Sequence, residues 1–369
     1  MKQRKVNKDL HATRVLLWIS VVFLLFFAQG CGQTQELQTE RAFYYWKSRL
    51  QLSDAETTAL QQLNISKLYV KFFDVVKDEL KENNVIPVAR INIDSTTLQK
   101  LDALQIELTP VVFITNESLQ YADSLFIESL AAKITGLVHI IHQKEKLKPF
   151  QELQIDCDWT TTTKENYFRL LKVIHAAMKT KDSCFTNNAL LSATIRLHQV
   201  KFRNKTGVPP VDKGLLMCYN MGYLKNPFTR NSILEPSEMK NYLAGFNTYP
   251  LPLDVALPLF EWHVYFSNNL YKGITTEIKS ENLSTSTGHW NSNRFIFERD
   301  TLLQNIAFKR GDVLRFEESK PEDIEQCIDF LKQNIRNKQF TVSFYHLDEL
   351  LLNKHPQHEL ETLYQRFHD

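Results

Sequence analysis

Glycine is scarce in this sequence, with 10 residues in a chain of 369, and this scarcity argues against one large class of proteins. Nucleotide-binding α/β proteins carry a glycine-rich loop after their first strand, where backbone amides approach the phosphates closely. The sequence contains no such loop after its first predicted strand. We therefore expect no nucleotide cofactor, and the doubly wound open sheet that carries such loops is the less favoured fold.

The sequence also lacks Cys, His or Glu residues at the spacing of metal ligands, and it lacks a large net charge. The five cysteines include no C-x-x-C pair, and no His/Glu set stands at ligand spacing, so we expect no metal. The formal net charge is +2. Residues 1–30 hold five Lys or Arg and one Asp, which leaves the rest of the chain near −2. This balance gives no electrostatic basis for binding nucleic acid.

The amino terminus has the pattern of an export signal. Basic residues precede an apolar run from Val15 to Ala28, which is short for a membrane span. Gly30 then stands directly before Cys31, as at a bacterial lipoprotein cleavage site. We expect residues 1–31 to be a lipoprotein signal peptide, with Cys31 carrying the lipid (palmitate), and 32–40 to be a tether. The protein would then be held to a membrane of the bacterial cell envelope; plain secretion and a retained anchor are the alternatives.

Strand-like and helix-like segments alternate through the rest of the chain. Short apolar runs of strand type recur eight times, separated by runs with helical spacing. The expected strands are 67–74, 85–93, 108–115, 152–160, 190–200, 214–221, 253–266 and 339–347. This rhythm predicts one (β/α)8 TIM barrel over residues 41–369, with residues 267–316 inserted between strands seven and eight.

The aromatic-rich stretch 41–49 has two interpretations. It contains Phe43, Tyr44, Tyr45 and Trp46. It is either a strand or helix that closes the bottom of the barrel, or a platform on which sugar rings stack.

The stretch 152–160 (E-L-Q-I-D-C-D-W-T) is the centre of the predicted site. Successive strand residues point to opposite faces, so Gln154, Asp156, Asp158 and Thr160 share one face. The active sites of α/β barrels lie at the carboxyl ends of the strands. The acids Asp156 and Asp158 therefore mark the mouth of the predicted barrel.

The other predicted strands also carry polar and aromatic residues near their carboxyl ends. Together with the two acids above, the candidate site residues are Asp74, Arg90, Arg196, His198, Tyr219, Asn220, Glu261 and Trp262. Such a lining suits a neutral polyhydroxylated ligand, because carboxylates and amides bind hydroxyl groups and aromatic rings stack on sugar faces. We therefore expect a carbohydrate as the ligand.

Two of these segments resemble the chitinase-type glycoside hydrolases of family eighteen. The fourth strand is similar to that family's D-G-x-D-x-D-x-E, with Asp156 and Asp158 at its second and third acids. The run Met217-Cys218-Tyr219-Asn220 is similar to its M-x-Y-D. The resemblance implies a TIM barrel in which Asp158 polarises a substrate acetamido group, Asp156 tunes its charge and Tyr219 hydrogen-bonds the acetamido oxygen.

The sequence departs from that family at three places. Leu153-Gln154 replaces the opening D-G, Asn220 replaces the Asp of the sixth strand, and Thr160 stands where the proton donor would be. Threonine cannot protonate a leaving oxygen, so hydrolysis would require another acid.

Three hypotheses follow from this pattern. In a glycosidase, Asp156, Asp158 and Glu261 would share the acid, base and nucleophile roles, since most glycosidases use two carboxylates. In a non-catalytic glycan-binding or structural lipoprotein, the barrel remains and the proton donor has been lost. In the third, the two aspartates form a structural ion-pair network with Arg90 and Arg196.

Overall fold

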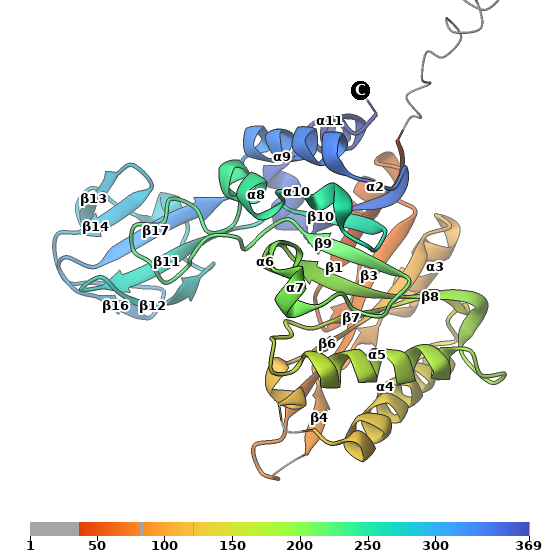
Figure 1. Cartoon of the computed structure of the whole chain (residues 1–369). Coiled ribbons are helices and arrows are strands. Elements are labelled where there is room, and N and C mark those ends of the chain that lie inside the picture. The colour runs from red at the N-terminus through yellow and green to blue at the C-terminus, as the bar shows by residue number, and fades with distance from the viewer. Residues whose placement is uncertain (1–36, 82–83, 121, 369) are drawn as a thin grey trace, which may run out of the picture. The chain divides into compact units, whose positions relative to one another are not determined.

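The computed structural model describes residues 37–81, 84–120 and 122–368, so the expected signal peptide and Cys31 lie outside the described residues. Eight parallel strands close into a barrel (Figure 1). In order around the barrel they are β1 (Gln38–Tyr45), β3 (Lys67–Lys77), β6 (Glu107–Ile114), β7 (Phe150–Asp156), β8 (Phe185–Arg196), β9 (Lys213–Met217), β10 (Leu253–Pro258) and β18 (Gln339–Tyr345). Strand β1 pairs with both β18 and β3, which closes the ring and confirms the predicted (β/α)8 fold.

One predicted barrel strand is wrong, and the aromatic-rich segment takes its place. Strand β1 contains most of the 41–49 stretch and begins at Gln38, so the last residues of the expected 32–40 tether belong to the barrel. Residues 85–93 instead form β4 (Val85–Val88), which folds back antiparallel on the end of β3, and the short β5 (Asn92–Ile93), which pairs with β2 (Arg49–Leu50). Pro87 lacks a backbone N–H and suits such an edge strand.

Helices follow the barrel strands in the order that the alternation predicts. They are α2 (Asp54–Gln62), α3 (Ser95–Ala103), α4 (Ser124–Glu145), α5 (Lys164–Met178), α6 (Leu197–Lys201), α7 (Arg203–Thr206), α8 (Pro236–Tyr242), α9 (Pro321–Asn334), α10 (Glu349–Lys354) and α11 (Gln357–Gln365). Short 3-10 turns occur at Asn116–Leu119 (η1), Phe246–Thr248 (η2) and Ser280–Asn282 (η3). Helix α4 would suit a membrane span by length and composition alone, but its buried residues pack into the apolar core between the helices and the barrel strands.

The insertion is larger than predicted because the seventh barrel strand is shorter. Strand β10 ends at Pro258, and Glu261 already begins a separate five-stranded antiparallel sheet. The order in this sheet is β12 (Leu270–Thr275), β11 (Glu261–Ser267), β17 (Val313–Glu318), β14 (Arg294–Phe297) and β13 (Gly288–Asn291). A small hairpin of β15 (Thr301–Leu303) and β16 (Ile306–Phe308) accompanies it. The insertion therefore spans 261–318 instead of 267–316.

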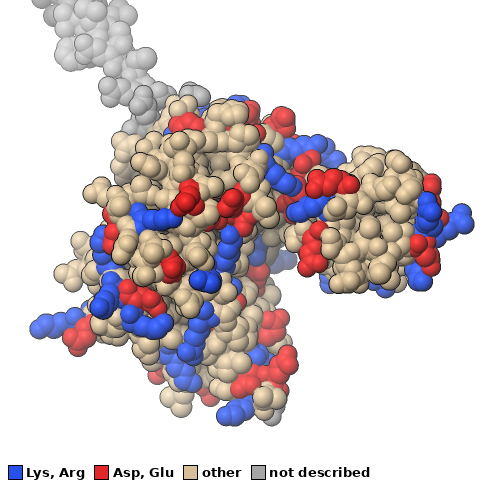
Figure 2. Space-filling view, turned by 180° about the vertical axis from the view of Figure 1, so that it is seen from behind, with Lys and Arg blue, Asp and Glu red and all other residues tan. Residues whose placement is uncertain are grey.

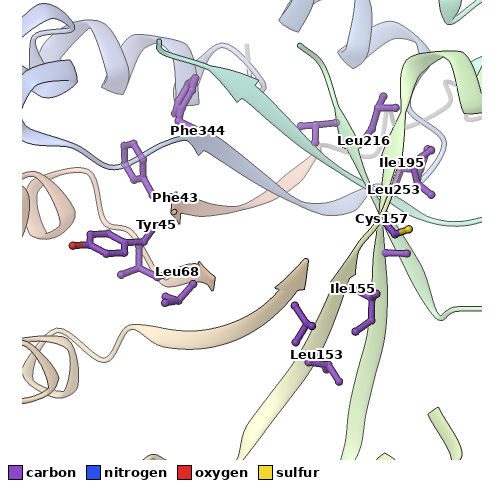
Figure 3. Close-up of a cluster of buried hydrophobic side chains, with 14 of the residues drawn as sticks. Phe43, Tyr45, Leu68, Leu153, Ile155, Cys157, Ile195, Leu216, Leu253 and Phe344 are labelled. Carbon is purple, nitrogen blue, oxygen red and sulfur yellow. The ribbon is translucent and has the colours of Figure 1, made fainter. Parts of the chain in front are cut away.

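Apolar side chains on the outer faces of the barrel strands pack under the helices. Phe43 of β1, Leu153 of β7 and Phe344 of β18 belong to this core and are fully buried (Figure 3). Ile155, Cys157 and Trp159 join the same cluster, as the alternation along the fourth strand predicted. Because parallel strands of a barrel bury both faces, the opposite faces are left to form the barrel interior.

The amino-terminal half of the barrel interior is filled by buried ion pairs. Lys213 Nζ lies 2.9 Å from Glu152 and 2.7 Å from Asp254, and Lys67 Nζ lies 3.4 Å from Glu152. Burial alone would raise the pKa of the Glu152 carboxyl, but Lys213 and Lys67 outweigh it and lower that pKa. The network closes the floor of the barrel, so an opening for a ligand is expected at the carboxyl ends of the strands.

Charged residues of both signs are interspersed on the face of the molecule that Figure 2 shows.

Candidate functional site

A cavity of about 440 Å³ lies at the carboxyl ends of the barrel strands. Strands β1, β3, β6, β7, β8, β9 and β18 contribute residues near their carboxyl ends, Phe260 follows β10, and the insertion closes one side. Seven aromatic rings line this cavity: Tyr44, Trp46, Phe113, Tyr219, Phe260, Trp262 and Tyr345. A concave site with many aromatic rings and a few convergent polar groups is typical of a small-ligand site.

Asp156, the last residue of β7, lies at the base of the cavity. Its side chain is buried, and Thr194 Oγ1 of β8 donates a hydrogen bond to Oδ1 at 2.5 Å. Burial raises the pKa of Asp156 to about 6; Arg196 opposes this shift, while Asp158 and Asp74 add to it. This carboxyl therefore takes up a proton as the pH falls through about 6, well above the range of an ordinary aspartate.

Asp158 lies just beyond the end of β7, and Arg196 at the end of β8 holds it. Arg196 Nε and Nη2 donate to the two carboxylate oxygens of Asp158 at 2.5 Å and 2.9 Å. The Asp158 side chain is 50% exposed, so this pair forms part of the cavity wall and is not hidden in the core. The two hydrogen bonds fix the position of the Asp158 carboxylate.

Asp74 of β3 forms a second charged group in the same cavity. Lys71 Nζ donates to Asp74 Oδ2 at 3.1 Å and lies 5.6 Å from the centre of the Trp46 ring. The other carboxylate oxygen, Oδ1, is buried and has no hydrogen-bond partner among the described residues. A buried acceptor without a partner is costly, so a ligand that donates a hydrogen bond there would be favoured.

Tyr219 follows β9 and also lines the cavity. Its side chain is only 3% exposed, and its hydroxyl has no hydrogen-bond partner within the described part of the chain. Burial raises the pKa of Tyr219 well above its usual value, so the hydroxyl keeps its proton and can donate it to a ligand oxygen.

The insertion supplies Glu261 and Trp262 from its first strand, β11. Glu261 forms an ion pair with Lys354 of α10. Trp262 Nε1 donates to Glu317 at 2.7 Å, and Glu317 is in turn held by Arg315 Nε at 2.7 Å. Glu261 and Trp262 are therefore fixed by partners outside the cavity, and Thr276 is a third cavity residue from the insertion.

The structure brings eight of the ten predicted site residues to this one cavity: Asp74, Asp156, Asp158, Arg196, Tyr219, Asn220, Glu261 and Trp262. The other two predicted site residues, Arg90 and His198, do not line the cavity. Arg90 lies in the exposed turn between β4 and β5, because 85–93 is not a barrel strand. His198 is exposed on α6, because β8 ends at Arg196 and the chain turns into a helix there.

Thr160 also departs from the expected shared face. Strand β7 ends at Asp156, and Thr160 is exposed in the turn before α5, where its backbone N–H donates to Thr163 Oγ1 at 3.0 Å. It does not line the cavity, so neither its chemistry nor its place suits a proton donor.

Several cavity residues were not predicted as site residues. Tyr345 is the last residue of β18 and Phe260 follows β10, and both strands end earlier than predicted. Phe113 is an apolar residue within β6 and was not singled out. Trp46 could have been found, since it directly follows the aromatic strand β1 and the alternative reading of 41–49 was a stacking platform.

The described residues contain no group of three or more His, Cys, Asp or Glu side chains that could hold a metal ion. The four described cysteines are free and buried, at Cys157, Cys184, Cys218 and Cys327.

Comparison with known proteins gives a fold but no close sequence relative. No protein-family model and no curated protein sequence matches the chain. The Bacillus cereus spore cortex-lytic enzyme SleL matches in structure with a TM-score of 0.52 and 13% identity, over 90% of this chain and 75% of that enzyme.

Plant and bacterial chitinases match similarly. A family-eighteen chitinase from Cycas revoluta, in complex with (GlcNAc)3, has a TM-score of 0.53 and 12% identity, over 89% of this chain and 99% of that one. The carboxyl-terminal domain of a chitinase-like protein from Desulfitobacterium hafniense has a TM-score of 0.54 and 9% identity, over 90% and 100%. With its closed ring of eight parallel strands, the chain thus has the (β/α)8 fold of the family-eighteen chitinases and of SleL.

Proposed function

We propose that the protein binds a carbohydrate in the cavity at the carboxyl ends of the barrel strands. The observation that carries this proposal is the convergence of seven aromatic rings with Asp74, Asp156 and Asp158 on one cavity of about 440 Å³. Aromatic rings supply flat apolar faces for sugar rings, and carboxylates accept hydrogen bonds from hydroxyl groups. The similar Cycas revoluta chitinase was solved with (GlcNAc)3, which supports the same class of ligand here.

We propose binding without cleavage as the main activity. Asp158 and Glu261 are each held in an ion pair, by Arg196 and Lys354. Thr160 replaces the acid of the resembling family and lies outside the cavity. A glycosidase needs one carboxyl that protonates the leaving oxygen, and an ion-paired carboxylate is a poor proton donor.

Hydrolysis is the second candidate, and one observation favours it. The pKa of Asp156 is raised to about 6, whereas Asp158 beside it is ion-paired to Arg196. Two carboxyls in such different environments are the arrangement from which acid and base roles arise. In that case Asp156 would be the acid and Asp158 the charged partner.

Titration calorimetry with a panel of soluble oligosaccharides tests both candidates, beginning with N-acetylglucosamine oligomers. Mass spectrometry of the same mixtures after long incubation detects any cleavage products. We expect saturable binding and no products. Products that disappear in Asp156→Asn would establish the hydrolase instead, and the absence of binding to every glycan would remove the proposal.

We also propose that the chain is a lipid-anchored protein of the bacterial cell envelope. This rests on the residues of 1–31 alone, with the basic start, the apolar run and Gly30 before Cys31. Labelled palmitate supplied to bacteria expressing the full chain should enter the wild type and the Gln35→Ala control. Cys31→Ala should lose the label and leave the membrane fraction. A Cys31→Ala variant that keeps the label and stays in the membrane fraction would contradict the lipid anchor.

A further inference from the structure

One side of the cavity holds more negative than positive charge. Asp74, Asp156 and Asp158 all line it. Two of them are paired with a cation: Asp74 with Lys71, and Asp158 with Arg196. Three carboxylates against two cations leave the group one positive charge short when all three are ionised.

Asp156 is the carboxylate without a cation of its own. Its hydrogen-bond donor is the neutral hydroxyl of Thr194, at 2.5 Å. Its pKa is raised to about 6 by burial, with Asp158 and Asp74 contributing after the opposing effect of Arg196. In the protein alone, a proton on Asp156 restores the balance of charge only below a pH of about 6. A ligand that carries a positive charge would restore it equally well.

Two polar atoms on this side of the cavity lack a hydrogen-bond partner, and a ligand could supply one to each. The Tyr219 hydroxyl, on a side chain only 3% exposed, and Asp74 Oδ1 are both buried without a hydrogen-bond partner in the described residues. An ionised carboxylate oxygen can only accept, so the group that meets Asp74 must be a donor. An ammonium group is such a donor, and the faces of nearby aromatic rings attract it as well.

A metal ion is a poorer fit to the same deficit. The described residues include no cluster of three or more side chains that could ligate one. Aromatic rings, among them Trp46 and Tyr219, line the same cavity as the carboxylates. They favour an organic cation over a hydrated metal ion.

We propose that the ligand is a glycan with at least one free, protonated amino group, such as a de-N-acetylated glucosamine residue, whose ammonium lies among Asp74, Asp156 and Asp158. This rests on the proposed carbohydrate binding and adds the chemical class of the sugar. The neutral part of the glycan would lie against the aromatic rings, and the ammonium would take the place of the missing cation.

A matched pair of ligands tests the inference. Glucosamine oligomers of one length, fully N-acetylated or fully de-N-acetylated, are titrated calorimetrically into the wild-type protein at a pH where their amines are protonated. We expect the de-N-acetylated oligomer to bind about tenfold tighter, which corresponds to about 1.4 kcal/mol. Both titrations are done at ionic strength of about 0.15 M, where distant surface charges are screened.

Two variants of opposite charge effect sharpen the test. Asp74→Asn removes a negative charge and should lower the ratio of the two affinities, whereas Lys71→Gln removes a positive charge and should raise it. Glu128→Gln, an exposed acid on α4 that pairs with Arg169, is the matched control and should leave the ratio unchanged. A thermal melt of each variant shows whether it is folded. The ratio of the two affinities measured on the wild-type protein tests the inference even if a variant does not fold.

The outcomes separate the two proposals. Tighter binding of the N-acetylated oligomer, or equal binding of both, overturns the ammonium inference and leaves carbohydrate binding intact. Binding of neither oligomer, nor of any other glycan in the panel, removes the proposed function itself. A preference for the de-N-acetylated oligomer that Asp74→Asn and Glu128→Gln reduce equally would show a general charge effect, and it would also overturn the inference.

Discussion

Arg196 Nε and Nη2 donate to both carboxylate oxygens of Asp158, at 2.5 Å and 2.9 Å, at the ends of two neighbouring barrel strands. The planar guanidinium fork matches the two oxygens of the carboxylate, which fixes the position of the Asp158 side chain. Asp156 lies two residues earlier and lacks such a partner, so the two acids differ in their chemistry. This difference underlies the predictions that follow.

Removing the guanidinium should change the titration of the neighbouring acid. Arg196 is the largest influence that lowers the pKa of Asp156, so Arg196→Met should raise that pKa above its value of about 6. Carbon-13 NMR of the labelled aspartate carboxyls over a pH series measures this directly. Arg169→Met on the outer helix α5 serves as the control and should leave the titration unchanged; an unchanged value in Arg196→Met would contradict the charge coupling.

Asp156 should make the protein more stable at acidic pH. Its folded-state pKa of about 6 lies above the unfolded value of 3.8, so the folded protein binds this proton more tightly. The resulting stability is fully present below pH 3.8 and is lost as the pH rises through about 6.

Asp156→Asn should therefore stabilise the protein at pH 7.5, by an amount of the order of 3 kcal/mol at most, and change it little near pH 4. Urea unfolding at the two pH values measures the difference. Equal effects of the substitution at both values would show that the proton linkage is absent.

Trp46 should contribute strongly to glycan binding. Its ring lies 6.4 Å from that of Phe113 and 6.0 Å from that of Tyr345, on the wall of the cavity. Trp46→Ala should weaken binding of the best oligosaccharide at least about tenfold, as the loss of a buried aromatic anchor commonly does. Trp290→Ala, on strand β13 of the insertion and outside the cavity, is the matched control, and equal losses in the two variants would argue against a stacking role.

The ion pairs of the barrel floor should matter for stability and not for binding. Lys213→Met would leave Glu152 and Asp254 without their shared cation in a buried site, so we expect a loss of about 3–5 kcal/mol in the free energy of unfolding. Lys309→Met breaks the exposed pair with Asp300, which water and salt screen, and should change the free energy of unfolding far less. Chemical denaturation of both variants gives the comparison, and similar values would mean that the floor network is not buried as described.

The sequence predicted the barrel well because parallel strands alternate with helices, but it misplaced one strand. Strand β1 buries both faces, with Phe43 and Tyr45 under the helices and Tyr44 inside the barrel. An all-apolar segment has no period of two, so periodicity could not separate a strand from a packing platform. The run 85–93 has a strand-like pattern, yet which strand it pairs with depends on long-range contacts that local sequence does not contain.

The site residues could be predicted where a polar side chain stands at or just after the end of an apolar strand. Asp156 and Asp158 follow the apolar run of β7, and Tyr219 follows that of β9, so their convergence needed only the barrel topology. The predictions for Arg90 and His198 were wrong because 85–93 is not a barrel strand and β8 ends before His198.

The partners of the site residues were partly beyond prediction. Arg196 was correctly named as a partner of the acidic pair, whereas the pairing of Glu261 with Lys354 joins residues that are far apart in the chain. Such contacts depend on how the insertion and the last helices pack, and no local pattern encodes them.

The most direct test is a crystal structure of the protein with the best-binding oligosaccharide from the panel. The account predicts a sugar ring in the cavity, against Trp46 or Trp262, with polar groups within hydrogen-bond distance of Tyr219 and Asp74. A sugar bound elsewhere on the molecule, with this cavity filled only by solvent, would contradict it.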